Sequence, residues 1–392
     1  MLYATSFSRL LLFITLSLFI TSTACTKSPV SGKIEWESAE FKKVVYLISF
    51  PTYESLVATF QGIIVDSANV DQTGNFAFTK MPGNGLYVLA IQSPKEKYNN
   101  KLTDEDPNIS NYLPFVFSGK TVSLTANARQ FQKTARWTKP DEVNAQISEL
   151  IVTRNNAFNQ HLSHLEAVNE ENLIEQHKAH YEYKKVLFDF ALATPHVSAA
   201  LLAMRWATPD GDFERSSDEL FAFCKKWEKE AASHAMIGQL CSKIKNGSLA
   251  AKKGDPFPEY ALPMSDGTEK NVHSLLGARL TIIDLWASWC GPCRIENKKI
   301  LGPIWEKYHS AGLQIIGYAL DSDDRSWKNA IAKDAADRWL HASHLQGDES
   351  PLFETLGIST IPANYLLDKE GRIVAKNLHG EELIQWIDVY MK

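Results

Sequence analysis

Two cysteines separated by two residues, Cys290 and Cys293, are the side chains in this sequence best suited to chemistry. Such a pair can exchange between a dithiol and a disulfide, or it can supply half of a zinc site. A structural zinc ion needs about four ligands, and the sequence contains neither a second Cys-x-x-Cys nor a Cys/His knuckle. The spacing therefore favours redox chemistry, and we expect neither a metal nor another cofactor.

The flanking residues predict the elements that position this pair. Residues 280–287 are mostly apolar and too few for a typical helix, which indicates a buried strand. Residues 294–310 carry apolar side chains at helical spacing. The first thiol, Cys290, then lies at a helix N-terminus, where free N–H groups and the helix dipole favour a thiolate. We therefore expect Cys290 to attack and Cys293, one turn inside the helix, to resolve the mixed disulfide.

The segment Trp289-Cys-Gly-Pro-Cys293 resembles the thioredoxin active site, and its context resembles the TlpA/ResA branch of membrane-attached thiol–disulfide oxidoreductases. The resemblance covers roughly residues 254–392. It implies a cis bond before Pro362, in a loop that faces the cysteines, with the Ile361 backbone pairing with the substrate. Trp289, Gly291 and Pro292 complete the expected substrate-binding set. The resemblance also implies a reducing direction, protein disulfides as substrates and a membrane protein as electron donor.

Two carboxylates are candidate proton acceptors for Cys293. Asp284 lies within the predicted strand, where an unpaired carboxylate has no structural benefit. Glu296 follows Cys293 by three residues, which is the same face of a helix. By resemblance, Asp284 matches the buried Asp of thioredoxin and Glu296 the active-site Glu of the ResA branch. We predict that Asp284 is the main acceptor and that Glu296 assists.

The rest of the C-terminal segment, residues 251–392, predicts strand, helix, strand, hairpin and closing helix, which is the thioredoxin order. We therefore expect an α/β domain with a central sheet covered on both faces. Residues 245–258, which overlap the start of this segment, are rich in Gly, Pro and Lys and predict a linker.

The N-terminal segment predicts export and attachment to a membrane. Residues 1–24 combine Arg9 with a short apolar run, as in a signal peptide. Small residues then precede Cys25, and this junction resembles a bacterial lipoprotein cleavage site with Cys25 as the lipidated residue. Ordinary cleavage and an uncleaved anchor are the alternatives. We expect a lipid-anchored protein on the periplasmic side of the cell envelope, where disulfides persist.

Two further regions lie between this segment and the C-terminal domain. Residues 25–136 predict short strands separated by turns, and therefore a small antiparallel β-sandwich. Its segments Ile64-Val-Asp-Ser-Ala and Gly74-Asn-Phe-Ala-Phe resemble a β domain often found ahead of such thioredoxin domains in bacterial lipoproteins, for which no chemistry is established. Residues 137–250 predict an all-α region. Within it, Cys224 and Cys241 lie at matching levels of a predicted helical hairpin. They can form a structural disulfide, or they can remain two thiols packed in the core.

Composition and motif details limit the competing functions. The chain has 392 residues, five cysteines and a net charge of −5, so it has no basic footprint for nucleic acid. A thiol peroxidase would place a Pro ahead of a lone reactive Cys, and residues 286–289 lack that Pro. A binding protein that uses the fold only as a scaffold is the other alternative, and the intact cysteine pair argues against it. The sequence thus favours an extracytoplasmic disulfide reductase.

Overall fold

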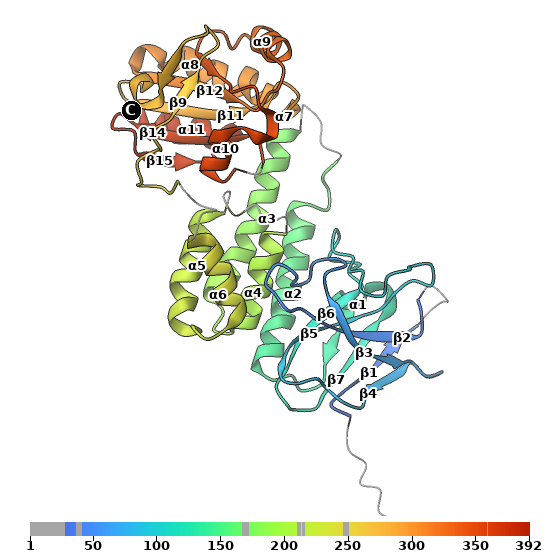
Figure 1. The fold of residues 1–392 in the computed structure, drawn as a ribbon. Coiled ribbons are helices and arrows are strands. Elements are labelled where there is room, and N and C mark those ends of the chain that lie inside the picture. Colours follow the sequence, from blue (N-terminus) through green and yellow to red (C-terminus); the bar gives the residue numbers. More distant parts are fainter. Residues whose placement is uncertain are drawn as a thin grey trace, which may run out of the picture.

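The structure is a computed structural model that describes residues 28–36, 41–166, 172–209, 213, 216–245, 251–358 and 360–392. The predictions for residues 1–24 and for Cys25 lie outside these ranges. The described chain is elongated: a β-rich region lies at one end, helices lie in the middle, and an α/β domain lies at the other end (Figure 1). Among the described helices, none combines the length and the hydropathy needed to cross a membrane.

The C-terminal domain is built on a five-stranded sheet in the order β13-β12-β11-β14-β15. Its strands are β11 Leu280–Trp286, β12 Leu313–Ala319, β13 Leu340–Ala342, β14 Ala363–Asp368 and β15 Ile373–Lys376. All seven residues of β11 are buried, as expected for a central strand covered on both faces. β12 runs parallel to β11 and β14 antiparallel to it. A small hairpin, β9 Ala261–Pro263 and β10 Glu269–Asn271, precedes the sheet.

The predicted helix over residues 294–310 is divided into three segments. They are α7 Gly291–Glu296, a π-helical turn Asn297–Leu301 and α8 Gly302–Tyr308. Pro303 lacks an N–H and cannot make a regular helical bond, and in the π turn the Gly302 N–H donates to the Asn297 carbonyl instead. The other helices of this domain are α9 Asp324–Lys333, α10 Pro351–Leu356 and α11 Gly380–Tyr390.

The β-rich region contains two four-stranded sheets, β4-β1-β7-β8 and β3-β2-β5-β6. Their strands are β1 Val30–Glu35, β2 Val44–Ser49, β3 Ile63–Asn69, β4 Asn75–Phe78, β5 Gly85–Ala90, β6 Tyr112–Phe117, β7 Val122–Asn127 and β8 Arg136–Trp137. The expectation of a purely antiparallel domain is wrong, because β1 and β7 pair in parallel. These two strands are far apart in the sequence, so no tight turn forces them to run in opposite directions.

Helices α2 Glu142–His161, α3 Leu173–Ala193, α4 Val197–Ala207, α5 Ser217–Glu230 and α6 Ala235–Lys245 form the middle of the molecule, and the short α1 Phe131–Thr134 precedes them. The buried apolar residues of the sheets and of these helices form one continuous cluster, from Val30 to Ile244. A second cluster, from Ala251 to Met391, belongs to the C-terminal domain. The sheets and the helices therefore share one core, although the sequence predicts them as separate regions.

Candidate active site

Cys290 and Cys293 are joined by a disulfide with an S–S distance of 2.06 Å and lie where β11 ends and α7 begins. Cys290 is the N-cap of α7, and its Sγ accepts a hydrogen bond of 3.2 Å from the Cys293 N–H. A thiolate at Cys290 would keep this donor and gain from the helix dipole. Cys290 therefore lies at the N-terminus of the helix, where we expected the first cysteine from the sequence.

The surroundings of the disulfide are open on one side. Both cysteines are nearly buried, with 4% of Cys290 and 2% of Cys293 exposed, whereas Trp289 beside them is 64% exposed. A Cβ built on Gly291 would meet no atom within 4 Å. A partner can therefore approach along the rim formed by Trp289, Gly291 and Pro292.

Two buried aspartates, Asp321 and Asp334, hold the loop that carries the cysteines. The Asp321 carboxylate accepts hydrogen bonds from the Ser288 N–H and hydroxyl. The Arg294 guanidinium binds Asp334 with both Nε and an Nη, and it also donates to the Ser288 carbonyl. Bidentate Arg–carboxylate pairs of this kind fix geometry well. Sequence reasoning missed both aspartates, because each is distant in sequence and acts only through the fold.

The bond between Ile361 and Pro362 is cis, and Pro362 lines the same cavity as Pro292. The fold thus brings the proline loop, which is about 70 residues distant, beside the cysteine segment. The residues predicted for substrate binding therefore come from two neighbouring loops, Trp289, Gly291 and Pro292 from one and Ile361 and Pro362 from the other.

Asp284 lies within β11, opposite Gly317 of β12 and Asn364 of β14. It is 3% exposed, and burial followed by the negative charge of Glu296 raises its pKa well above the usual range for a carboxyl. A carboxyl of this kind can hold or accept a proton near neutral pH. The structure therefore places both predicted carboxylates within electrostatic reach of each other.

Glu296 has a partner that the sequence did not reveal. Its carboxylate contacts His379 Nδ1 at 3.1 and 3.0 Å and accepts a hydrogen bond of 3.3 Å from the Gly380 N–H. Asn364 positions this segment, because it exchanges hydrogen bonds with the backbone of Leu378. His379 was missed because a lone histidine 83 residues from Glu296 carries no pattern that predicts the pair.

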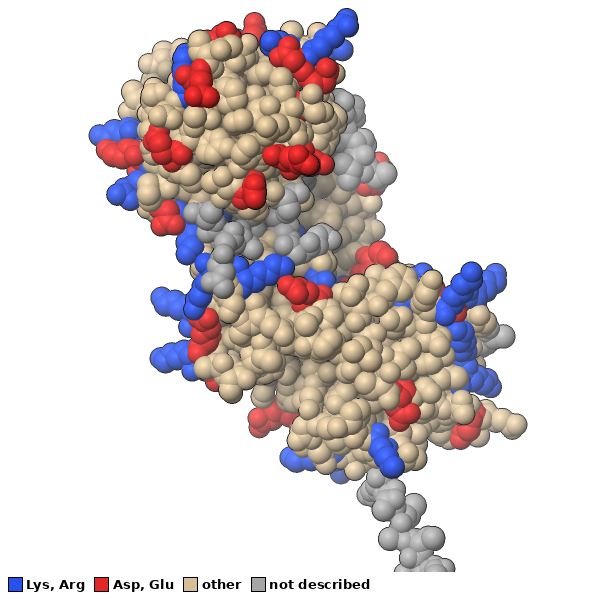
Figure 2. Space-filling model, in the orientation of Figure 1, with Lys and Arg blue, Asp and Glu red and all other residues tan. Residues whose placement is uncertain are grey.

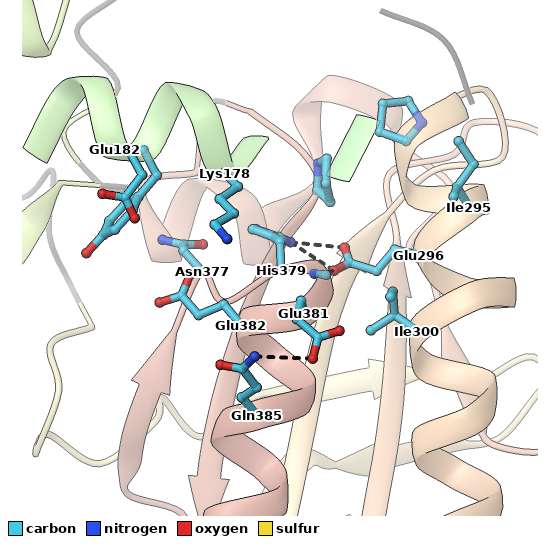
Figure 3. Close-up of a pocket in the computed structure, with 14 residues that line it drawn as sticks. Lys178, Glu182, Ile295, Glu296, Ile300, Asn377, His379, Glu381, Glu382 and Gln385 are labelled. Atoms are coloured by element: carbon cyan, nitrogen blue, oxygen red, sulfur yellow. Dashed lines mark hydrogen bonds and ion pairs between the residues drawn. The ribbon is translucent and has the colours of Figure 1, made fainter. Parts of the chain in front are cut away.

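A cavity of about 320 Å³ opens beside these groups. Figure 3 shows Glu296, His379 and Glu382 on one side of it and Lys178 and Glu182 of α3 on the other.

Within the described ranges, no group of three His, Cys, Asp or Glu side chains has the arrangement of a metal site. On the face drawn in Figure 2, acidic and basic side chains are interspersed over both ends of the molecule.

The domain combines a covered sheet, a Cys-Gly-Pro-Cys disulfide at a helix N-terminus with a cis-proline loop beside it, and a buried carboxyl in the strand that precedes the disulfide. Together these features define a thioredoxin-like domain suited to disulfide exchange. Residues 252–384 match the family model described as Redoxin.

Similar proteins cover the same part of the chain. A thiol-disulfide oxidoreductase ResA from Bacillus thuringiensis is 24% identical over 139 residues, which is 36% of this chain and 76% of that protein. A thiol:disulfide interchange protein DsbE from Pseudomonas fluorescens is 26% identical over 141 residues, which is 34% of this chain and 71% of that protein. A solved thiol-disulfide oxidoreductase from Bacteroides fragilis is 28% identical and covers 34% of this chain and 98% of its own, with a TM-score of 0.32. The protein is a thioredoxin-like thiol–disulfide oxidoreductase.

Proposed function

We propose that this protein reduces disulfides in extracytoplasmic partner proteins through the Cys290 and Cys293 dithiol. The observation that carries the proposal is the position of Cys290, whose sulfur caps α7 and accepts the Cys293 N–H. The similarity to the ResA and DsbE proteins, which are named for exchange between thiols and disulfides, supports the proposal.

The proposed reaction has two exchanges. The Cys290 thiolate attacks one sulfur of the partner disulfide, so a mixed disulfide forms and the other partner sulfur leaves as a thiolate. Cys293 then loses its proton and attacks Cys290, which releases the second partner sulfur and closes the Cys290–Cys293 disulfide. Two electrons have then passed to the partner. Regeneration of the dithiol needs an external electron donor, which we propose is a membrane protein.

Asp284 is the proposed proton acceptor for Cys293, with Glu296 assisting. Burial raises the Asp284 pKa, which makes this carboxyl a base of useful strength near neutral pH. Glu296 already accepts from His379 and Gly380, so its oxygens are more fully engaged. This difference supports the ranking that the sequence suggested.

The proposed substrate surface combines Trp289, Gly291 and Pro292 with Ile361 and Pro362. The exposed Trp289 ring offers apolar contact. The Ile361 backbone would pair with an extended segment of the partner, as in β-strand addition.

The proposed location is the periplasmic side of the cell envelope, with a lipid on Cys25. The support is the sequence alone: a short apolar run and small residues that precede Cys25. Replacing Cys25 by Ala should release the protein into the soluble fraction or block processing, measured by fractionation and N-terminal mass. Unchanged attachment with an unchanged mass would exclude the lipid.

Reduction of insulin disulfides by the reduced full-length protein tests the activity. We expect catalysis over the rate given by dithiothreitol alone, and no catalysis by Cys290→Ser. Rapid consumption of hydrogen peroxide without disulfide reduction would support the peroxidase alternative instead. Inertness in both assays would support the scaffold alternative.

A further inference from the structure

We call the sheets and helices that share the core from Val30 to Ile244 the N-terminal unit. Helix α3 belongs to this unit, yet it lines the cavity beside the redox disulfide. Lys178, Tyr181 and Glu182 of α3 line this cavity together with Pro292 and Pro362. In Figure 3, the α3 side chains face the segment that carries His379 and Glu382. A partner segment that reaches the cysteines past the two prolines would therefore also contact α3.

The charge of the cavity indicates what it would accept. The described residues that line it include four glutamates and one lysine, and one of the glutamates, Glu296, contacts His379; the five residues are Glu182, Glu296, Glu381, Glu382 and Lys178. Burial raises the pKa of Glu382. The interaction with His379 lowers this pKa, and the negative charge of Glu182 raises it. Glu182 of α3 and Glu382 of α11 both line the cavity, and a cation bound between two carboxylates is attracted by both.

The cavity adjoins a larger one, which favours a polypeptide over a small molecule. The second cavity measures about 890 Å³ and shares Tyr181, Asn377 and His379 with the first. It extends between the helices and the β-rich region, and aromatic side chains line it; these are Phe158, Tyr181, Tyr183, Phe188 and Trp206. An extended chain could fill both cavities, with apolar side chains in the larger one.

We propose that the cleft between α3 and the C-terminal domain binds the polypeptide segment that flanks the target disulfide, and that Glu182 and Glu382 select a lysine or arginine near the reactive cysteine. The proposal rests on the proposed reductase function and names the substrate class of that site. α3 is then a specificity-determining element, although it lies outside the residues that match the Redoxin family.

Two synthetic peptides test the proposal with the reduced full-length protein. Each carries one intramolecular disulfide, and they differ only by Lys or Gln beside one cysteine. We expect kcat/KM to be about fivefold higher for the Lys peptide, the effect of one partly exposed ion pair. In the Glu182→Gln, Glu382→Gln double variant this preference should fall to about one. Lys178→Gln should increase the preference, because it removes the competing ammonium.

Two controls separate this effect from a general defect. Glu175→Gln makes the same change on an exposed position of α3 outside both cavities and should leave the preference intact. Reduction of 2-hydroxyethyl disulfide, which is small and neutral, measures the intrinsic activity of each variant, and each pair of peptide rates is compared within one variant. Equal kcat/KM for both peptides in the unaltered protein, or an unchanged preference in the double variant, would overturn the proposal.

A binding measurement keeps this result distinct from failure of the proposed function. Calorimetry with the oxidised protein and peptides that carry Ser for Cys needs no turnover. We expect the Lys peptide to bind about fivefold more tightly than the Gln peptide, and the double variant to lose this difference. Selective binding without disulfide reduction would refute the reductase function and keep the cleft, whereas reduction without selective binding would refute the cleft.

Discussion

The part of the chain that the structure describes contains two disulfides whose cysteines are almost equally buried. Cys224 and Cys241 are 3% and 0% exposed, against 4% and 2% for Cys290 and Cys293. The Cα–Cα distances are also similar, 5.6 and 5.3 Å. Burial and spacing therefore do not distinguish the redox disulfide from the other one.

The neighbours of the two disulfides differ strongly. The Cys224–Cys241 disulfide joins α5 to α6 within the apolar core, among Leu220, Trp227 and Ile237. The other disulfide lies at a helix N-terminus, with an exposed tryptophan beside it and two interacting carboxylates nearby. We propose that reactivity follows from a stabilised thiolate and an available proton acceptor, and the predictions below test this contrast.

The largest expected effect is on turnover. Cys290→Ser and Cys293→Ser should each lower disulfide reduction by about a thousandfold or more, because the two thiols act as one unit. Only Cys293→Ser should accumulate mixed disulfides with partner proteins, detected on non-reducing gels and identified by mass spectrometry. Equal trapping by both variants would contradict the assignment of Cys290 as the attacking thiol.

The next effect concerns the proton. Asp284→Asn should slow the release of a preformed mixed disulfide about a hundredfold, since general base catalysis is lost, while the first attack by Cys290 stays within about threefold. Stopped-flow measurements can follow each step separately. Glu296→Gln is the matched control and should slow release less. The opposite ranking would make Glu296 the main acceptor.

The second disulfide should matter for stability and little for turnover. Replacing Cys224 and Cys241 together by Ala should lower the free energy of unfolding of the N-terminal unit by about 2–4 kcal/mol. Guanidinium unfolding measures the loss. Disulfide reduction by the folded variant should stay within about twofold of the unaltered protein. A large fall in turnover would mean that this disulfide exchanges electrons too.

The smallest expected effect concerns the protonation of Asp284 and its contribution to stability. The folded pKa of Asp284 is raised, so the folded protein keeps a proton that the unfolded chain loses above a pKa of about 3.8. The stability of the oxidised protein should therefore fall as pH rises through the raised value, and Asp284→Asn should remove this loss. At pH 7 we expect the variant to be more stable by about 1–2 kcal/mol. Denaturant titrations between pH 4 and 8 would show whether the gain grows with pH.

Local patterns predicted much of the C-terminal domain. The apolar run before Cys290 is β11, and the hairpin and closing helix of the domain also form as expected. β6 carries no continuous strand pattern, because Pro114 interrupts it. The strand tolerates this proline because it is an edge strand. The short β13 was missed, because three residues carry almost no periodic signal.

The parts that could not be predicted depend on contacts between distant segments. His379 meets Glu296 only because β14 and α11 return to the active-site helix. Likewise, α3 reaches the redox site through tertiary packing, and a helical pattern does not say what its polar face will meet. The sequence thus predicted the chemistry of neighbouring residues, but it did not predict the contacts that His379 and α3 make from distant segments.

The elongated order of the molecule has a consequence for geometry at a membrane. Figure 1 shows the β-rich region and the redox domain at opposite ends, with α3 between them. If Cys25 carries a lipid as proposed, the five residues from there to Val30 span at most about 18 Å. The β-rich region would then rest close to the headgroups and act as a stalk that holds the disulfide far above them. An electron donor in the bilayer would then need an outer domain that extends equally far from the membrane, or this protein would have to tilt toward the membrane surface.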